Sequence, residues 1–326
     1  MLTNPAVSIV IPAYKSAEIL PELVRQLGDT LGAIWPGGKF EVIIVNDASP
    51  DNTWQVLEKL ANSEPWLKAV NLRKNSGQHS ALMAGMRLAS GATVVLMDDD
   101  LQHSPADVQR LCAVLDDNVD VCYAAFPDKK HARWKIWGSR FNNWTSEFLI
   151  EKPTGLQLSS FKALKKEIVD EVVKYSGPFP YVDGLILACT SRAANLEVRH
   201  NLRHSGAGNY SFFASLFLWT KMAINFSVVP LRIASLLGAA FSTLGLSAAL
   251  LLVFLKISHI AEASVPGWSS VVVLMLLIGG VQLLALGAIG EYLGRTYVHL
   301  NGKPQYLIQK KVGFEDIAAT DFEAPR

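Results

Sequence analysis

Short apolar runs alternate with longer amphipathic stretches through residues 7–124, and this alternation constrains the fold more than any other feature of the chain. The apolar runs are VSIVIP (7–12), EVIIVND (41–47), LKAVNL (67–72), ATVVLMD (92–98) and VDVCYA (119–124). Helices are predicted between them, near residues 18–32, 53–63, 79–90 and 105–117. Continuous apolar strands separated by helices are typical of a mainly parallel sheet with helices on both faces. We therefore predict a Rossmann-like α/β domain.

The residues that follow the predicted strands are polar or aromatic. Ligands of such sheets bind at the carboxyl ends of the strands, where this chain places Pro12, Tyr14, Asp47 and the segment DDDLQ (98–102). No GxGxxG follows the first strand, and no GxxxxGK[ST] occurs in the sequence. A dinucleotide-binding dehydrogenase is therefore disfavoured, and a P-loop enzyme is excluded.

The acidic triplet is the sharpest of these features. Three adjacent carboxylates at the end of a buried strand repel one another and lose hydration, which is costly without compensation. A hard cation such as Mg²⁺ or Mn²⁺ would compensate, bound by Asp98, Asp100 and the carbonyl oxygen of Gln102. Such an ion would neutralise a diphosphate leaving group. The alternative is a solvated acidic turn or a helix start before Pro105.

Two uncharged apolar runs, residues 233–255 and 271–289, contribute to a hydrophobic content of 50%. Runs of this length predict two transmembrane helices, and the alternative is a buried helical hairpin of a soluble protein. Lys and Arg are more frequent outside the pair of runs than in the short loop between them. The positive-inside rule therefore predicts that both termini lie in the cytoplasm.

The predicted layout has four parts. The N-terminus lacks the pattern of a signal peptide, so the first domain is expected to stay in the cytosol. A stretch rich in Phe, Leu and Trp precedes the first run and predicts an interfacial helix, with a buried helix of the domain as the alternative. The parts are a catalytic domain (1–210), the interfacial helix (211–230), two transmembrane helices (231–294) and a cytosolic tail (295–326).

Charge and cysteine content exclude some classes of protein. The net charge is +1, so no bulk basicity indicates a nucleic-acid partner. Cys112, Cys122 and Cys189 show no CxxC spacing, and their number closes no set of disulfides. We expect thiols in a reducing compartment.

Several motifs together resemble one family. In chain order they are PAY (12–14), NDAS (46–49), NSGQHSALMAG (75–85), DDDLQ (98–102), GxxxYS (206–211) and GEYLGR (290–295). This order resembles the polyisoprenyl-phosphate glycosyltransferases of glycosyltransferase family two, which have the GT-A fold. GQHSA and GEYLGR are most similar to the bacterial undecaprenyl-phosphate branch. The resemblance implies inverting transfer of a sugar from a nucleotide-sugar to undecaprenyl phosphate at the cytoplasmic face of the bacterial inner membrane, for modification of cell-envelope glycans.

The resemblance also implies roles for residues of the donor site. The nucleotide pocket would be lined by Pro12, Tyr14 and Asp47, and the helix beside the donor would begin with Gln78 and His79. The metal ligands would be Asp98, Asp100 and Gln102. The loop near the donor diphosphate would carry Arg203, Tyr210 and Ser211. Asp98, Asp100 and Arg203 would carry the catalysis, and Asp99 would contribute to donor binding. The alternatives are a helix start chosen for local turn geometry and, for Arg203, a surface arginine of a loop.

The stretch KKHARWKIWGSRFNNW (129–144) interleaves basic and aromatic residues. Such a pattern suits an amphipathic helix on an anionic membrane surface. The resemblance implies that Lys135 and Arg140, with Ser139 nearby, hold the phosphate of the polyisoprenyl acceptor. The alternative is a helix that contacts membrane lipid without a specific phosphate site.

Two departures from the family pattern keep other functions open. Asn209 stands where many relatives have a lysine. Many relatives also carry an aspartate and a glycine before the segment that in this chain is residues 156–161, and the chain departs from that pattern. A non-catalytic, membrane-anchored scaffold that binds sugar nucleotides is therefore a second hypothesis. A processive synthase would bring more spans and a QxxRW motif, and two spans without polar interruptions make a poor transporter. Small residues in the second run would permit helix packing in a homo-oligomer; they are Gly279, Gly280, Gly287 and Gly290.

Overall fold

The structure is a computed structural model, and it describes residues 5–37, 39–126, 153, 155–198 and 267–314, with scattered positions between 236 and 254. The chain divides into two compact units. One unit comprises Met1–Asn209 together with Gly302–Arg326, and the other comprises Tyr210–Asn301.

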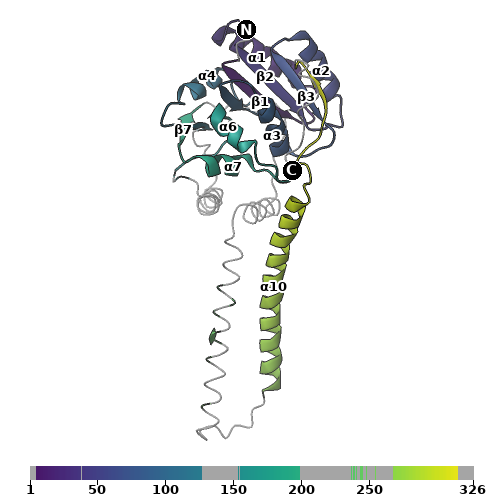
Figure 1. The fold of residues 1–326 in the computed structure, drawn as a ribbon, viewed down its shortest axis with the longest axis vertical. Helices are drawn as coiled ribbons and strands as arrows, with labels where there is room; N and C mark the ends of the chain where they lie inside the picture. Colours follow the sequence, from purple (N-terminus) through teal and green to yellow (C-terminus); the bar gives the residue numbers. More distant parts are fainter. Residues whose placement is uncertain are drawn as a thin grey trace. The chain divides into compact units, whose positions relative to one another are not determined.

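The first unit is built on one mixed sheet of eight strands (Figure 1). The strand order is β7-β5-β6-β4-β1-β2-β3-β8. Strands β4, β1, β2 and β3 run parallel, as do β5 and β7, whereas β6 and β8 pair antiparallel with their neighbours. The strands are β1 (Val7–Ala13), β2 (Phe40–Asn46), β3 (Leu67–Leu72), β4 (Thr93–Leu96), β5 (Val121–Ala125), β6 (Lys162–Lys165), β7 (Ala193–Glu197) and β8 (Ile308–Val312). The predicted mixed, mainly parallel α/β sheet is confirmed.

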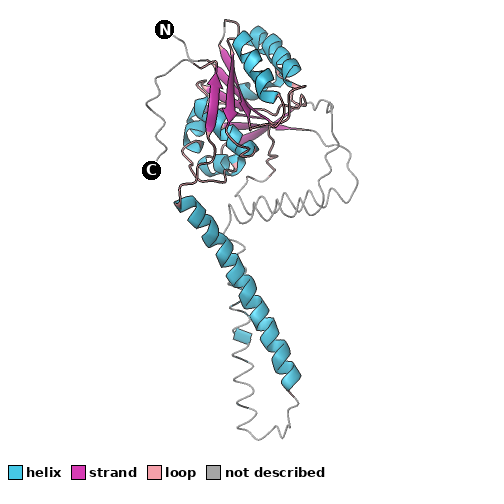
Figure 2. Ribbon diagram, turned by 90° about the vertical axis from the view of Figure 1, so that its right-hand side faces the viewer, coloured by secondary structure: helices cyan, strands magenta, loops and turns pink. Residues whose placement is uncertain are grey.

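Helices cover both faces of the sheet, as Figure 2 shows from the side. Each face has its own apolar core, because successive side chains of a strand point to opposite faces. Ile9 and Ile11 of β1 pack with α1, α2 and α4, whereas Val10 packs with α3, α6 and α7. The helices are α1 (Leu20–Ile34), α2 (Thr53–Ser63), α3 (Gln78–Leu88), α4 (Ala106–Ala113), α6 (Lys166–Val172) and α7 (Val182–Cys189).

Helix α3 lies unusually close to the sheet. A Cβ atom at Gly85 would lie 2.3 Å from Cγ1 of Val10 in β1, far inside van der Waals contact. The last glycine of NSGQHSALMAG therefore serves the packing of α3 against β1. This packing fixes the helix that begins at the candidate site.

The chain returns to the sheet at β8, which the sequence had not predicted. β8 pairs with the edge strand β3, and the N–H of Arg73 donates to the carbonyl of Leu307 at 2.8 Å. Residues 308–312 lie within the segment predicted as a cytosolic tail (295–326), and in the structure they add a strand beside β3. The backbone groups of β3 are thereby paired on both sides, and β8 becomes the edge strand.

The second unit contains α10 (Trp268–Leu300), which includes the second uncharged run. Large apolar side chains of α10 are exposed, among them Val271, Leu274, Met275, Leu283 and Leu286. In the part of the chain that the structure describes, no helix is both long and apolar enough to cross a membrane. The predicted interfacial helix at 211–230 lies outside the described residues, as does the first predicted span apart from scattered positions.

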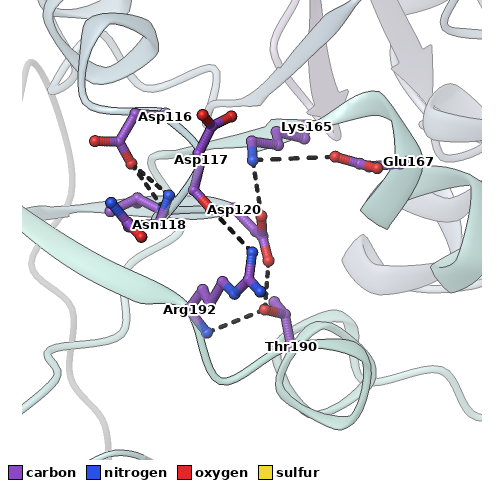
Figure 3. A network of polar contacts seen from close by, with 9 residues as sticks. Asp116, Asp117, Asn118, Asp120, Lys165, Glu167, Thr190 and Arg192 are labelled. Carbon is purple, nitrogen blue, oxygen red and sulfur yellow. Dashed lines mark hydrogen bonds and ion pairs between the residues drawn. The ribbon is translucent and has the colours of Figure 1, made fainter.

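Polar contacts join β5, β6 and the loop between α7 and β7 (Figure 3). The Asp120 carboxylate accepts bonds from Lys165 at 2.9 Å and from the Thr190 hydroxyl at 2.7 Å, and Arg192 donates to the Asp117 carbonyl at 2.9 Å. Burial alone would raise the pKa of Asp120, but the hydrogen bonds from Lys165 and Thr190 outweigh it and lower that pKa. The network holds the antiparallel part of the sheet in register.

The amino-terminal ends of the parallel strands are joined by one buried carboxylate, that of Glu41. It accepts hydrogen bonds from the Ser8 hydroxyl, from the N–H and hydroxyl of Ser90 and from the Lys68 ammonium. Burial alone would raise the pKa of Glu41, but the bonds from Lys68, Ser8 and Ser90 outweigh it and lower that pKa. This cluster joins β1, β2, β3 and the turn before β4 at the edge opposite the carboxyl ends of the parallel strands.

We predict that Glu41→Gln lowers the free energy of unfolding by about 2–4 kcal/mol at pH 7, because it leaves Lys68 without its buried partner. A folded-state carboxylate with a lowered pKa stabilises above its unfolded pKa of about 4.3, so the deficit should shrink as the pH falls below that value. Chemical unfolding at pH 7 and pH 3.5 measures both effects. The control is Glu58→Gln, whose partner Lys310 is 55% exposed; its cost should stay below about 1 kcal/mol. Equal costs for the two variants would contradict the prediction.

Candidate functional site

Backbone strain gathers at the carboxyl ends of β1, β2 and β4. Outside glycine, the described residues with positive φ are Lys15 (59°), Ala48 (49°) and Leu101 (62°), and each lies a few residues beyond one of these strands. A residue other than glycine costs about 1–3 kcal/mol when its φ is positive, and such strain concentrates at functional sites. The three turns meet at one edge because the strands are parallel neighbours.

The turn after β1 presents Tyr14 and anchors Ser16. Tyr14 is 47% exposed, and the Lys15 ammonium lies 5.5 Å from the centre of its ring. Ser16 is buried; its N–H donates to the Thr53 hydroxyl at 3.0 Å, and its own hydroxyl donates to the Asp99 carboxylate. Pro12 is buried near the end of β1. The pairing of β1 with β4 ends before it, at Val10 with Leu96, so β4 needs no backbone N–H from position 12, which proline lacks.

Asp47 holds the loop that leads into α3. Its side chain is buried, and its two oxygens accept the N–H groups of Ser76 at 2.7 Å and Gly77 at 2.8 Å. Gly77 has φ of 90°, which a side chain would strain. Asp47 therefore positions the start of α3 beside the strand ends, and its expected contact with the nucleotide stays a prediction.

Both oxygens of the Asp98 carboxylate have hydrogen-bond partners from other parts of the chain. One oxygen accepts the side-chain amide of Gln78 at 2.8 Å, the other accepts the hydroxyl of Ser160, and its N–H donates to Nδ1 of His103 at 3.2 Å. The His103 ring is buried and stacks on Phe161 at 4.8 Å between centres. Sequence reasoning missed Ser160 and His103; for His103 the signal was its position directly after DDDLQ.

The middle carboxylate of the acidic turn, that of Asp99, is largely buried and has a raised pKa. Its pKa is raised to about 6, chiefly by burial; the hydrogen bond from Ser16 lowers the pKa, and the neighbouring charges of Asp98 and Asp100 raise it. Burial and the two neighbouring carboxylates therefore disfavour the charged form of Asp99. A bound cation would favour that charged form.

Asp100 and Gln102 complete the turn. The N–H of Gln102 donates to Oδ1 of Asp100 at 3.1 Å, whereas Oδ2 has no hydrogen-bond partner among the described residues. The described ranges hold no group of three or more His, Cys, Asp or Glu side chains placed to bind a metal. The residues nevertheless fit a hard divalent cation, since Asp98 and Asp100 supply carboxylate oxygens, which are the ligands that such an ion prefers.

His79 is the second residue of α3 and contacts the start of α7. Its Nδ1 accepts the N–H of Val182 at 3.4 Å, and its ring meets the Tyr181 ring edge-on at 5.2 Å. Burial lowers the pKa of His79, the nearby Lys162 lowers it further, and the carboxylates of Asp183 and Asp98 act in the opposite direction. The structure thus brings Gln78 to Asp98 and turns His79 toward α7.

The remaining predicted site residues lie outside the described residues. They are the acceptor residues Lys135, Ser139 and Arg140 and the diphosphate-loop residues Arg203, Tyr210 and Ser211. Their roles stay predictions. The described part of the site is the part predicted to bind the donor, called the donor half below, and it is formed by the turns after β1, β2 and β4 and the start of α3.

A match to a protein-family sequence model decides the class of this site. Residues 8–173 match the family described as glycosyl transferase family 2, and the match includes all three strand-end turns. The chain belongs to glycosyl transferase family 2. This membership confirms the resemblance drawn from the motifs.

Relatives of this family 2 chain match it along nearly their whole length. The undecaprenyl-phosphate 4-deoxy-4-formamido-L-arabinose transferase of Proteus mirabilis is 30% identical over 312 residues, which are 94% of each chain. The protein of the same name from Klebsiella pneumoniae is 29% identical over 329 residues, covering 98% of this chain and 99% of that one.

Solved structures are more distant from this family 2 chain. A mannosyltransferase from Pyrobaculum calidifontis, in complex with GDP-Man and Mn²⁺, is 18% identical and covers 90% of this chain and 88% of its own, with a TM-score of 0.48. Glucosyl-3-phosphoglycerate synthase from Mycobacterium tuberculosis is 15% identical, covering 69% and 79%, with a TM-score of 0.48.

We predict that Asp99→Asn stabilises the metal-free protein at pH 8 by about 2 kcal/mol. A carboxyl group whose folded pKa is about 6 loses stability as the pH rises from its unfolded pKa of about 3.9 through 6, and asparagine has no proton to lose. Unfolding in EDTA at pH 4 and pH 8 should show the gain at pH 8 and little difference at pH 4. Asp170→Asn, at an exposed position of α6, is the control. A gain of the same size at both pH values would contradict this explanation.

Proposed function

We propose that this chain transfers a sugar from a nucleotide-sugar to the phosphate of a polyisoprenyl lipid. The observation that carries the proposal is the set of strained turns at one sheet edge, where Asp98, Asp99 and Asp100 concentrate negative charge beside the start of α3. The names of the relatives, which specify undecaprenyl phosphate as acceptor, support the same reaction.

The donor would bind across the strand ends. The exposed ring of Tyr14 and the loop held by Asp47 offer a surface for the nucleotide. Asp98 and Asp100, with Gln102, would hold Mg²⁺ or Mn²⁺. Such an ion supplies positive charge for the diphosphate of the donor. Ser16, Ser160 and Gln78 keep the carboxylates of this turn in fixed orientations.

The reaction is a single displacement with inversion. An oxygen of the lipid phosphate attacks the anomeric carbon as the bond from that carbon to the nucleoside diphosphate breaks. A phosphate monoester loses its second proton near pH 6, so the acceptor is largely dianionic at neutral pH and needs no strong base. Positioning of the two substrates and stabilisation of the leaving group would therefore carry the catalysis. Arg203, Lys135, Ser139 and Arg140 are the proposed contacts to phosphate groups.

A membrane location follows from the nature of the acceptor. The uncharged runs at 233–255 and 271–289 would anchor the chain with the catalytic unit at the cytoplasmic face of the inner membrane. The exposed apolar side chains of α10 support contact with lipid. The headgroup of the acceptor would then be confined near the site.

The experiment is transfer from labelled UDP-, GDP- and dTDP-sugars, including UDP-4-deoxy-4-formamido-L-arabinose, to undecaprenyl phosphate with Mg²⁺, Mn²⁺ or EDTA. We expect labelled lipid from one donor, and only with metal. Nucleotide binding by folded protein that forms no lipid product would favour the non-catalytic scaffold.

We predict that Asp100→Ala lowers the transfer rate at least about a hundredfold, because the leaving diphosphate loses charge compensation. The matched control is Asp170→Ala, which removes an exposed carboxylate paired with Lys166 on α6 and should leave the rate unchanged. Full activity of Asp100→Ala would contradict the assigned role of the acidic turn.

A further inference from the structure

A buried ion pair lies next to the donor half of the site and has no part in the mechanism above. Lys162, the first residue of β6, is 2% exposed, and its ammonium donates to the carboxylate of Asp183 in the first turn of α7. The same ammonium lies 5.0 Å from the centre of the Tyr123 ring. Lysine is almost never fully buried without a charged partner, and this pair satisfies that condition.

Stability alone is a weak reason for such a pair. The loss of hydration offsets much of the attraction between two buried charges, and an apolar pair of similar volume is often as stable or more stable. What the pair does supply is a fixed geometry between the two elements that carry it. The question is therefore which groups β6 and α7 hold in place.

Both elements lead to Asp98. On the β6 side, Lys162 follows Phe161 and Ser160, and the Ser160 hydroxyl donates to one oxygen of Asp98. On the α7 side, Asp183 follows Val182, whose N–H donates to Nδ1 of His79.

The ring closes through α3. His79 follows Gln78, whose amide donates to the other oxygen of Asp98 at 2.8 Å. The contacts therefore form a closed ring that starts and ends at Asp98, and the Lys162–Asp183 pair is the link between its two arms.

We propose that Lys162 and Asp183 are positioning residues for the transfer reaction, acting on Asp98 through Ser160 on one arm and through His79 and Gln78 on the other. The inference rests on the proposed function for the role of Asp98 at the donor. Partners behind a ligating side chain commonly change metal affinity or activity by about 10–100-fold when they are removed. The pair would fix the direction in which the two oxygens of Asp98 face the donor.

The test separates positioning from stability with the apolar double variant Lys162→Met/Asp183→Leu in the full chain. We expect its midpoint of chemical unfolding to lie no lower than that of the wild type, since no buried charge is left unpaired. We also expect about tenfold weaker binding of Mn²⁺, measured from free Mn²⁺ by electron paramagnetic resonance, and a lower kcat in the transfer assay. The control is Lys166→Met/Asp170→Leu, which removes an exposed pair of α6 and should change neither.

Asp183→Glu is the second variant, and it tests the positioning role of the pair if the double variant does not fold. It keeps the charge but adds a methylene group, so it shifts α7 against β6 and should also weaken Mn²⁺ binding. Wild-type affinity and kcat in the folded variants would overturn the inference, as would a wild-type chain that binds no Mn²⁺. A wild type that binds Mn²⁺ but forms no lipid product defeats only the proposed function, since the Mn²⁺ affinities still test the pair.

Discussion

The parallel pairing of β4, β1 and β2 is the constraint on which the rest of the site depends. β1 and β2 pair from Val7 with Phe40 to Ala13 with Asn46, and β4 joins β1 up to Val10 with Leu96. Chain segments far apart in the sequence therefore end at one edge of the sheet. That edge receives the exposed Tyr14, Asp47 with the loop that it holds, and the acidic turn, and each of the three turns contains a non-glycine residue with positive φ.

Carboxylates at the two edges formed by the ends of the parallel strands have pKa values shifted in opposite directions. At the amino-terminal edge, Glu41 accepts hydrogen bonds from Lys68, Ser8 and Ser90, which lower its pKa. At the carboxyl-terminal edge, burial and like charges raise the pKa of Asp99 to about 6, with one serine hydroxyl as partial compensation. The charged form of a carboxylate is thus favoured at the first edge and disfavoured at the second, where a bound cation would favour it.

Much of the parallel half of the fold could be predicted from the sequence, because its strands are continuous apolar runs. β1, β2 and β3 lie within a residue of their predicted positions, and β4 and β5 lie within about two residues. The antiparallel strands β6 and β8 escaped prediction since each is short and contains lysines, and their place depends on pairing with strands remote in sequence. The same reason hid Ser160: nothing local to it reveals a contact with Asp98, which is 62 positions away. Gly85 shows the reverse case, in which a motif residue suggested by the family serves packing.

An experimental structure of the chain with Mn²⁺ and the nucleoside diphosphate of its donor would test the acidic turn directly as the metal site. We predict an anomalous Mn²⁺ signal at the carboxylates of Asp98 and Asp100, with the nucleotide over the turns after β1 and β2 and the diphosphate facing the acidic turn. Nucleotide bound elsewhere on the sheet, or Mn²⁺ ordered away from these carboxylates, would contradict it.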